Sequence, residues 1–171
     1  MHHQTTARLP FWGLLLGLVM IAAPQAAQAF ERGASSVALA IGSGQQLGRD
    51  YTVIKGRYGY FFVREFEASM AVEMWRGNSP EIYKFVPELR YVNSLAQILK
   101  PYASVFVGFT TYGGAAADRF SYGVKAGVYR TINPGAYLGL GLVHERIENC
   151  DPAVYRNCQY TYPEVSLNFT F

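Results

Sequence analysis

Charge is scarce in this sequence. Only 16% of the 171 residues are charged, whereas soluble domains average about 25%, so the chain has too little charge for an ordinary soluble surface. The net charge of only +3 and the lack of any run of Lys or Arg argue against a nucleic-acid partner. Half of the residues are hydrophobic, which excludes a disordered chain.

Long apolar runs are also absent after the first 30 residues, where nothing approaches the roughly 18 residues that a transmembrane helix needs. One apolar run lies before that point, in residues 11–23, and it has about the length of the hydrophobic region of a signal peptide. Ala27 and Ala29 place small residues where signal peptidase requires them. We therefore predict a cleaved signal peptide over residues 1–29 and one domain over residues 30–171. A retained N-terminal transmembrane helix is the alternative.

What the chain does contain is alternation. Apolar and polar residues alternate with a period of two in residues 66–74, 120–129 and 164–171, and apolar and small residues alternate in 138–143. This period is typical of β-strands that have two different faces. Eight strands can be drawn, each long enough for a tilted strand to cross a bilayer: about 35–46, 50–62, 66–76, 82–92, 100–112, 120–131, 136–147 and 160–171.

Alternation alone fits a soluble sandwich or lipocalin-like barrel, whose apolar face points inward, as well as a membrane barrel, whose apolar face meets lipid. Two features favour the membrane barrel: small and charged residues share the polar face, and aromatic residues lie near strand ends on the apolar face. These aromatic residues are Tyr83, Tyr91, Phe120, Tyr122, Phe169 and Phe171. The terminal Phe171 also resembles the signal that outer-membrane proteins present to the barrel-assembly machinery.

Strands in lipid must close into a ring, because an open edge leaves backbone groups unpaired. Eight is the even number of strands that this length accommodates. We therefore predict an all-β fold, a closed antiparallel up-and-down transmembrane barrel of eight strands. The connections at 77–81, 113–119 and 148–159 are rich in Gly, Pro, Asn or Ala and are expected to face the cell exterior.

The inward face of this barrel is predicted to carry charge. An eight-stranded barrel is filled by side chains, so we expect a network of salt bridges there, and a narrow selective pore is the alternative. The expected members are Glu67, Glu73, Lys84, Glu88, Arg90, Lys125, Glu145 and Glu164, and Lys55 and Arg57 are candidates to join them. Pro87 lies within the fourth strand, so a bulge or register break is expected there.

The chain has only two cysteines, Cys150 and Cys158, and both fall in the last outer connection. An even number in an exported protein indicates a disulfide, which would stabilise the chain by roughly 2–3 kcal/mol. A metal site made by both thiols and Asp151 is disfavoured, because exported thiols are oxidised and the loop has no His. We expect no metal and no cofactor.

His144 is the only histidine after the signal peptide, and it lies in the lipid-facing phase of the seventh strand. The sequence LGLGLVHER, which ends at Arg146, resembles the stretch before the catalytic His of the outer-membrane lipid A deacylases. The resemblance implies a Ser two residues after the His, but Arg146 stands there, so a Ser–His pair is not formed. We predict no catalytic residue. We expect His144 and Arg146 to contact lipopolysaccharide phosphates at the outer rim.

As a whole, residues 30–171 resemble the small outer-membrane barrels of Gram-negative bacteria, of the outer-membrane-protein-X or OmpA-transmembrane-domain type. The resemblance rests on the signal peptide, the eight alternating segments and the terminal YPEVSLNFTF. It implies a monomer in the outer membrane that contacts lipid and lipopolysaccharide and has a structural or surface-interaction role. A lipid A-modifying hydrolase and a narrow channel are the alternatives.

Overall fold

The computed structural model describes residues 29–46, 49–95, 98–113, 118–150 and 158–171, so the predicted signal peptide lies outside it except for Ala29. No helix in these ranges is long and apolar enough to cross a membrane. The strands are β1 (Ser35–Gln46), β2 (Arg49–Val63), β3 (Phe66–Arg76), β4 (Ile82–Val92), β5 (Leu99–Tyr112), β6 (Arg119–Asn133), β7 (Ala136–Ile147) and β8 (Gln159–Thr170).

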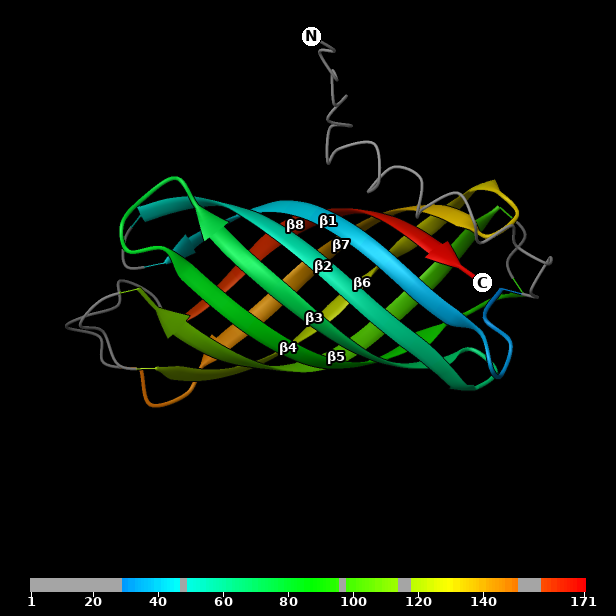
Figure 1. The fold of residues 1–171 in the computed structure, drawn as a ribbon, viewed down its shortest axis with the longest axis horizontal. Coiled ribbons are helices and arrows are strands. Elements are labelled where there is room, and N and C mark those ends of the chain that lie inside the picture. Colours follow the sequence, from blue (N-terminus) through cyan, green and yellow to red (C-terminus); the bar gives the residue numbers. More distant parts are fainter. Residues whose placement is uncertain (1–28, 47–48, 96–97, 114–117, 151–157) are drawn as a thin grey trace, which may run out of the picture.

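The eight strands close into a barrel in chain order (Figure 1). Each strand pairs antiparallel with the next, and β8 returns to pair with β1, placing Leu167 opposite Leu39. Closure therefore pairs both edges of the sheet, as a lipid environment demands. The predicted fold class is confirmed, and the eight strands agree with the predicted segments to within about two residues at each end.

The two ends of the barrel differ. The end at which the chain finishes at Phe171, marked C in Figure 1, is called the turn end, and the opposite end is called the loop end. Phe30 also lies at the turn end, since its carbonyl accepts a hydrogen bond from the N–H of Glu65. The turn end has the connections 64–65, 93–98 and 134–135, and the loop end has 47–48, 77–81, 113–118 and 148–158. In outer-membrane barrels short turns face the periplasm and longer loops the exterior. The loop end is therefore the expected outer end.

Burial alternates along the strands, as the period of two predicts. From Tyr51 to Phe61 in β2, every second side chain is buried and those between are exposed. The exposed set is apolar, with Leu39 61% and Val105 60% exposed, whereas the buried set includes charged side chains. Apolar groups outside and charged groups inside are the reverse of a soluble barrel, so the soluble alternative is wrong.

Pro87 interrupts the ladder between β4 and β5 without changing its register. The pair at Pro87 and the pair before it are missing, because proline has no N–H to donate. Phe85 still lies opposite Phe109, and Glu88 opposite Phe106, so the register is the same on both sides. The expected bulge or register break at Pro87 is therefore wrong. The register shifts instead near the turn-end ends of the β2–β3 and β6–β7 pairs, beside the turns.

Two aromatic clusters close the interior at its ends. The loop-end plug consists of Tyr51, Val53, Ala71, Trp75, Ile82, Val86, Phe106, Tyr112, Val143 and Tyr162. The turn-end plug consists of Phe30, Ala34, Phe61, Val92, Tyr102, Tyr129 and Tyr137. The charged side chains lie between the two plugs.

Candidate functional site

Among the described residues, ten charged side chains are buried in the barrel interior, five acidic and five basic. They are Lys55, Arg57, Glu67, Glu73, Lys84, Glu88, Arg90, Lys125, Glu145 and Glu164. All eight residues expected to face inward are therefore in the interior, and the two candidates, Lys55 and Arg57, lie with them. They come from β2, β3, β4, β6, β7 and β8, so residues far apart in the sequence meet in the centre of the ring.

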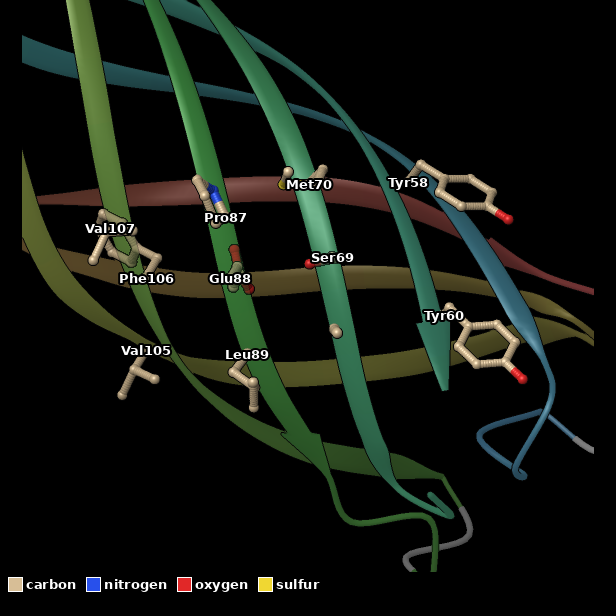
Figure 2. Close-up of a pocket in the computed structure, with 11 residues that line it drawn as sticks. Tyr58, Tyr60, Ser69, Met70, Pro87, Glu88, Leu89, Val105, Phe106 and Val107 are labelled. Carbon is tan, nitrogen blue, oxygen red and sulfur yellow. The ribbon is translucent and has the colours of Figure 1, made fainter. Parts of the chain in front are cut away.

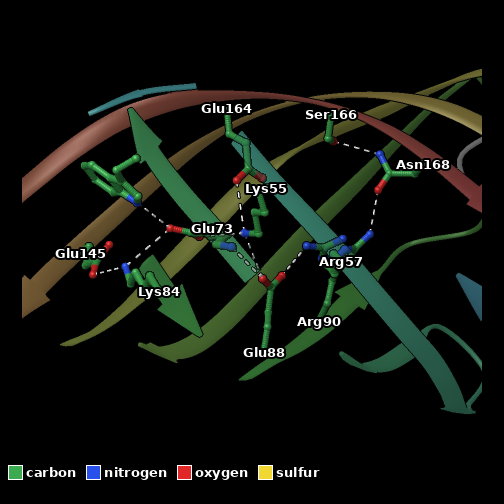
Figure 3. Close-up of polar contacts among 12 residues, drawn as sticks. Lys55, Arg57, Glu73, Lys84, Glu88, Arg90, Glu145, Glu164, Ser166 and Asn168 are labelled. Atoms are coloured by element: carbon green, nitrogen blue, oxygen red, sulfur yellow. Dashed lines mark hydrogen bonds and ion pairs between the residues drawn. The ribbon is translucent and has the colours of Figure 1, made fainter. Parts of the chain in front are cut away.

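The half of the network nearer the loop end is built on Lys55 and Lys84 (Figure 3). Lys55 Nζ lies 3.3 Å from carboxylate oxygens of both Glu73 and Glu164. Lys84 forms an ion pair with Glu145 and lies 3.9 Å from Glu73. These contacts join five strands, β2, β3, β4, β7 and β8, and each acid in this half has a basic partner.

Glu88 is the centre of the other half. Its carboxylate pairs with Arg90, lies 2.7 Å from Lys125 Nζ, and lies 3.9 Å from Lys55 Nζ. Arg90 continues to Glu67 at 3.6 Å. Glu88 therefore connects the two halves into one network (Figure 3).

Towards the turn end the network ends on neutral polar groups. Arg57 donates to Glu67 at 2.8 Å and to the Asn168 side-chain oxygen at 2.7 Å. Asn168 in turn donates to the Ser166 hydroxyl at 2.9 Å. Glu67 also accepts from the Ser36 hydroxyl. These neutral partners take up hydrogen-bonding capacity that the ion pairs leave over, as buried polar groups require.

Gly59 is needed beside Glu67. A Cβ atom at this position would collide with the Glu67 carboxylate and with the Ser36 hydroxyl. The lack of a side chain at Gly59 therefore leaves the space in which Arg57, Glu67 and Ser36 meet.

Equal numbers of acids and bases make this interior electrically neutral. A buried ion pair loses hydration that its attraction roughly repays, so the network is weak evidence for added stability. Removing one partner is different, because it leaves a buried charge without compensation. The network therefore makes the interior sensitive to any single charge change.

The aromatic plugs contact the network directly. The Trp75 indole donates to Glu73 at 3.2 Å in the loop-end plug, and Arg90 lies 5.0 Å from the ring centre of Tyr102 in the turn-end plug. Sequence reasoning did not name these plug residues. A signal was present, because Trp75 is in phase with Glu73 along β3.

Phe30 lies across the turn end of the barrel, a position that no sequence pattern predicts. Its ring centre lies 4.9 Å from that of Tyr137 and 5.6 Å from that of Phe61, and the side chain is 4% exposed. Its carbonyl accepts a 2.7 Å hydrogen bond from the Glu65 N–H. Phe30 and Glu65 both have positive φ angles, 71° and 68°. Residues with a side chain rarely adopt such angles, so contacts with the surrounding residues hold both of them in this conformation.

His144 lies on the outside of β7, towards the loop end. Its Nδ1 atom is 2.8 Å from the Thr161 hydroxyl on β8, and both residues are exposed. Arg146, one step nearer the loops on the same face, pairs across strands with Tyr122 and Gln159. The structure thus gives His144 a hydroxyl neighbour, but it is on a different strand from the position where the deacylases have Ser.

The loop end carries two further ordered features. Cys150 and Cys158 form a disulfide, as predicted, although residues 151–157 between them lie outside the described ranges. The connection 77–81 is fixed to the start of β2, since Asn78 donates to the Asp50 carbonyl at 2.6 Å and Arg49 donates to the Ser79 carbonyl. The loop end therefore presents a surface whose shape is held by a disulfide and by hydrogen bonds to β2.

Phe171 pairs with β1 through its backbone. Its N–H donates to the Ser35 carbonyl at 3.0 Å, and its carbonyl accepts from the Ser35 N–H at 2.8 Å. The side chain is exposed on the outer face at the turn end. Its predicted role as an assembly signal stays a prediction. Among the described residues, no group of three or more His, Cys, Asp or Glu is arranged to hold a metal ion.

Comparison with solved structures defines the class of fold. The N-terminal barrel domain of Pseudomonas aeruginosa OprF superposes with a TM-score of 0.65 at 10% identity, covering 82% of this chain and 98% of that one. Neisserial surface protein A gives 0.61 at 14% identity, covering 81% and 96%. The Yersinia pestis protein Ail gives 0.52 at 11% identity, covering 82% and 100%.

The fold is that of the small eight-stranded outer-membrane β-barrels, as the sequence predicted. These structural neighbours are outer-membrane proteins, which supports the predicted location in the outer membrane. No protein-family model matches the sequence, and no curated protein matches it.

Proposed function

We propose that the protein is a non-enzymatic outer-membrane barrel that acts through its loop end, in envelope structure or in surface contact. The observation that carries this proposal is the filled interior. Ten paired charges occupy the centre, and an aromatic plug covers them on either side. With the interior filled, the loops and the outer rim are the surfaces left to meet a partner.

The shaped loop end supports this role. One connection is closed by the Cys150–Cys158 disulfide, and the connection 77–81 is hydrogen-bonded to β2. Two structural neighbours are named as a Neisserial surface protein and as an attachment invasion locus protein. At this level of identity those proteins share the fold alone, so the proposed surface role rests on the loops.

Neither alternative is favoured by the geometry. A channel would need a continuous path, but the two plugs and the ion pairs fill the interior of the described barrel. A deacylase-like hydrolase would need a nucleophile beside His144 and an acid to orient it. The imidazole of His144 contacts the Thr161 hydroxyl, but among the described residues no carboxylate is hydrogen-bonded to it, and Arg146 stands where that family has Ser.

The location is tested by electrophoresis of outer-membrane fractions, with and without boiling. We expect the unboiled protein to migrate differently from the boiled one, because a closed ladder of eight strands resists detergent until it is heated. The control is a sample reduced without boiling, which should keep the band shift because the barrel closes without the disulfide. A soluble periplasmic protein with no band shift would contradict the proposal.

We propose further that His144 and Arg146 bind lipopolysaccharide phosphates at the outer rim. Both side chains project from the outer face beyond Leu142, which is the last outward-facing apolar residue of β7. The double variant His144→Ala/Arg146→Ala should reduce bound lipopolysaccharide by about tenfold or more, since charge-assisted hydrogen bonds are lost. Lipopolysaccharide that co-purifies with the protein is the measurement.

Arg130→Ala is the matched control, because Arg130 is an exposed cation near the turn end of β6. It should leave the bound amount unchanged. Equal lipopolysaccharide on the wild type and on the His144/Arg146 double variant would reject this site.

A further inference from the structure

The outer face of the barrel has two walls of unequal height. On β3, β4, β5 and β6, five or six successive outward positions of each strand are apolar. Figure 2 shows part of this wall, with Met70, Leu89 and Val105 on three of the strands. At about 3.3 Å per residue and a tilt of about 40°, these positions form an apolar band about 25–30 Å tall, which is enough for an outer membrane.

On β7, β8 and β1, which we call the narrow wall, the apolar band is shorter. Within these strands the outward apolar residues are Leu138, Leu140 and Leu142 on β7, Pro163, Val165, Leu167 and Phe169 on β8, and Val37, Leu39 and Ile41 on β1. Three or four outward positions make a band about 15–20 Å tall by the same reasoning. One side of the barrel is therefore too short for the membrane that the other side fits.

The missing height lies at the loop end. On β7 the outward apolar residues end at Leu142, which pairs with Ala126, but on the neighbouring strand β6 they continue for six more residues to Phe120. The band on β6 thus reaches roughly 10–15 Å higher. Tilting the barrel would even this out only if the narrow wall reached further at the turn end. It does not, because β7 begins at Ala136 and the outward residue that begins β1 is the polar Ser35.

Polar side chains take the place of the missing band. The exposed outward residues there are Ser43 and Gln45 on β1, His144 and Arg146 on β7, and Gln159 and Thr161 on β8. Outward aromatic rings mark the loop end of β4, β5 and β6, at Tyr83, Phe109 and Phe120, but the described residues of the narrow wall have none there. Aromatic girdles form where a barrel meets the membrane interface, so the narrow wall is not fitted to an interface at that height.

The pairing that closes the ring also stops short at the narrow wall. The β1–β2 and β7–β8 ladders continue to the loop ends of their strands, but the β1–β8 ladder ends where Gly42 lies opposite Glu164. The same register would next pair Ser43 with Pro163, and proline has no N–H to donate. Strand edges that lose their ladder partner need water or polar groups, because hydrocarbon offers no hydrogen bond. Water and lipid headgroups are therefore expected to reach down to this level.

We propose that the membrane thins along the narrow wall and that phospholipids cross between its two leaflets there, so that the barrel speeds their exchange. Over the loop-end part of the path, a crossing headgroup meets hydroxyl and amide groups instead of hydrocarbon, which lowers its desolvation cost. Bilayer lipid suits a wall of uneven height, because lipid adapts to a short apolar band by thinning. No selectivity among phospholipid headgroups is expected, since the path has no paired acid and base to read them.

This activity goes beyond the proposed surface role and does not depend on it. The test uses liposomes made of phospholipid alone, so lipopolysaccharide is absent. Failure of the lipopolysaccharide site at His144 and Arg146 would leave the exchange activity standing, and failure of the exchange test would leave that site standing.

Fluorescence bleaching in liposomes tests the proposal. The liposomes contain the folded mature chain and a trace of phospholipid with a fluorescent headgroup. Dithionite added outside bleaches the outer leaflet, so later loss of fluorescence measures lipid that arrives from the inner leaflet. The wild type should exchange lipid at least about tenfold faster than protein-free liposomes, because the barrier falls with the height of the apolar path. A water-soluble dye enclosed in the liposomes should stay fluorescent, which shows that dithionite does not enter.

Ser43→Leu/Thr161→Leu extends the apolar band on β1 and β8 and should slow the exchange by about tenfold. Thr111→Leu is the matched control. Thr111 is an exposed residue at the loop end of β5, where the outward positions are already apolar up to Phe109, so this variant should exchange lipid as the wild type does. The unboiled band shift verifies that each variant is folded.

Pro163→Val keeps the test decisive if the double variant does not fold. It restores a backbone N–H and leaves the wall apolar, so the β1–β8 ladder can continue and the exchange should slow. Undiminished exchange in either folded variant would overturn the proposal, as would a wild type no faster than protein-free liposomes. A wild-type dimer joined through the narrow wall would also overturn it, because a second copy would then take the place of lipid.

Discussion

Glu88→Leu is expected to destabilise the barrel by about 3–5 kcal/mol, because it leaves a buried lysine without its counter-ion. Of the three bases near Glu88, Arg90 keeps Glu67, and Lys55 keeps Glu73 and Glu164. Lys125 has no second ion pair among the described residues. Its ammonium would remain buried with no carboxylate within ion-pair distance. Urea unfolding in detergent or liposomes measures the loss.

Two controls separate this effect from ordinary charge removal. Glu81→Gln removes an ion pair with Arg76 whose side chains are both about half exposed, so it should cost no more than about 1 kcal/mol. Glu88→Leu/Lys125→Met replaces the pair by apolar groups and should recover much of the lost stability. A single variant as stable as Glu81→Gln, or a double variant no better than the single, would show that the network does not act in this way.

Which side chains of each strand point into the barrel was predictable, because the inner and outer faces of the sheet meet different surroundings. Lipid selects apolar residues at every second position, and the interior tolerates charge only where it is paired. Glu67 and Glu73 could therefore be assigned to the interior from β3 alone. Their partners could not be assigned, because Lys55 and Lys84 reach Glu73 from neighbouring strands, whose register is fixed only when the ring closes.

Pro87 shows where a local rule fails. A bulge would shift the side chains on one side of Pro87 by one position, which would turn either Glu88 or Lys84 towards lipid. Losing ladder hydrogen bonds at one step costs less than placing a charge in hydrocarbon. The need to keep every charge inside the barrel therefore preserves the register, and only the ladder pairs of Val86 and Pro87 are lost.

Phe30 could not be found from alternation, since it precedes the first strand. Its position depends on the turn that precedes β1. In this turn the Gly33 N–H donates a 2.8 Å hydrogen bond to the Phe61 carbonyl. If cleavage follows Ala29, as predicted, the first residue of the mature chain is the one that completes the turn-end plug.

Phe30→Ala should therefore destabilise the mature barrel by about 3–5 kcal/mol, because a buried aromatic ring is lost and the space beside Phe61 and Tyr137 is left empty. Phe62→Ala is the matched control. Phe62 is 41% exposed on the outer face of β2, where lipid or detergent replaces the missing ring, so its loss should be clearly smaller. Urea unfolding of both variants in the same detergent gives the comparison.

Conductance across a planar bilayer distinguishes a stabilising plug from a gate. Phe30→Ala should remain insulating although it is less stable, because the loop-end plug around Trp75 and the ion pairs of Glu73 still close the interior. Steady currents through Phe30→Ala but not through Phe62→Ala would mean that Phe30 alone holds a path shut, and the channel alternative would then replace the surface role. Equal stability of the two variants would instead show that the aromatic contacts of Phe30 do not support the fold.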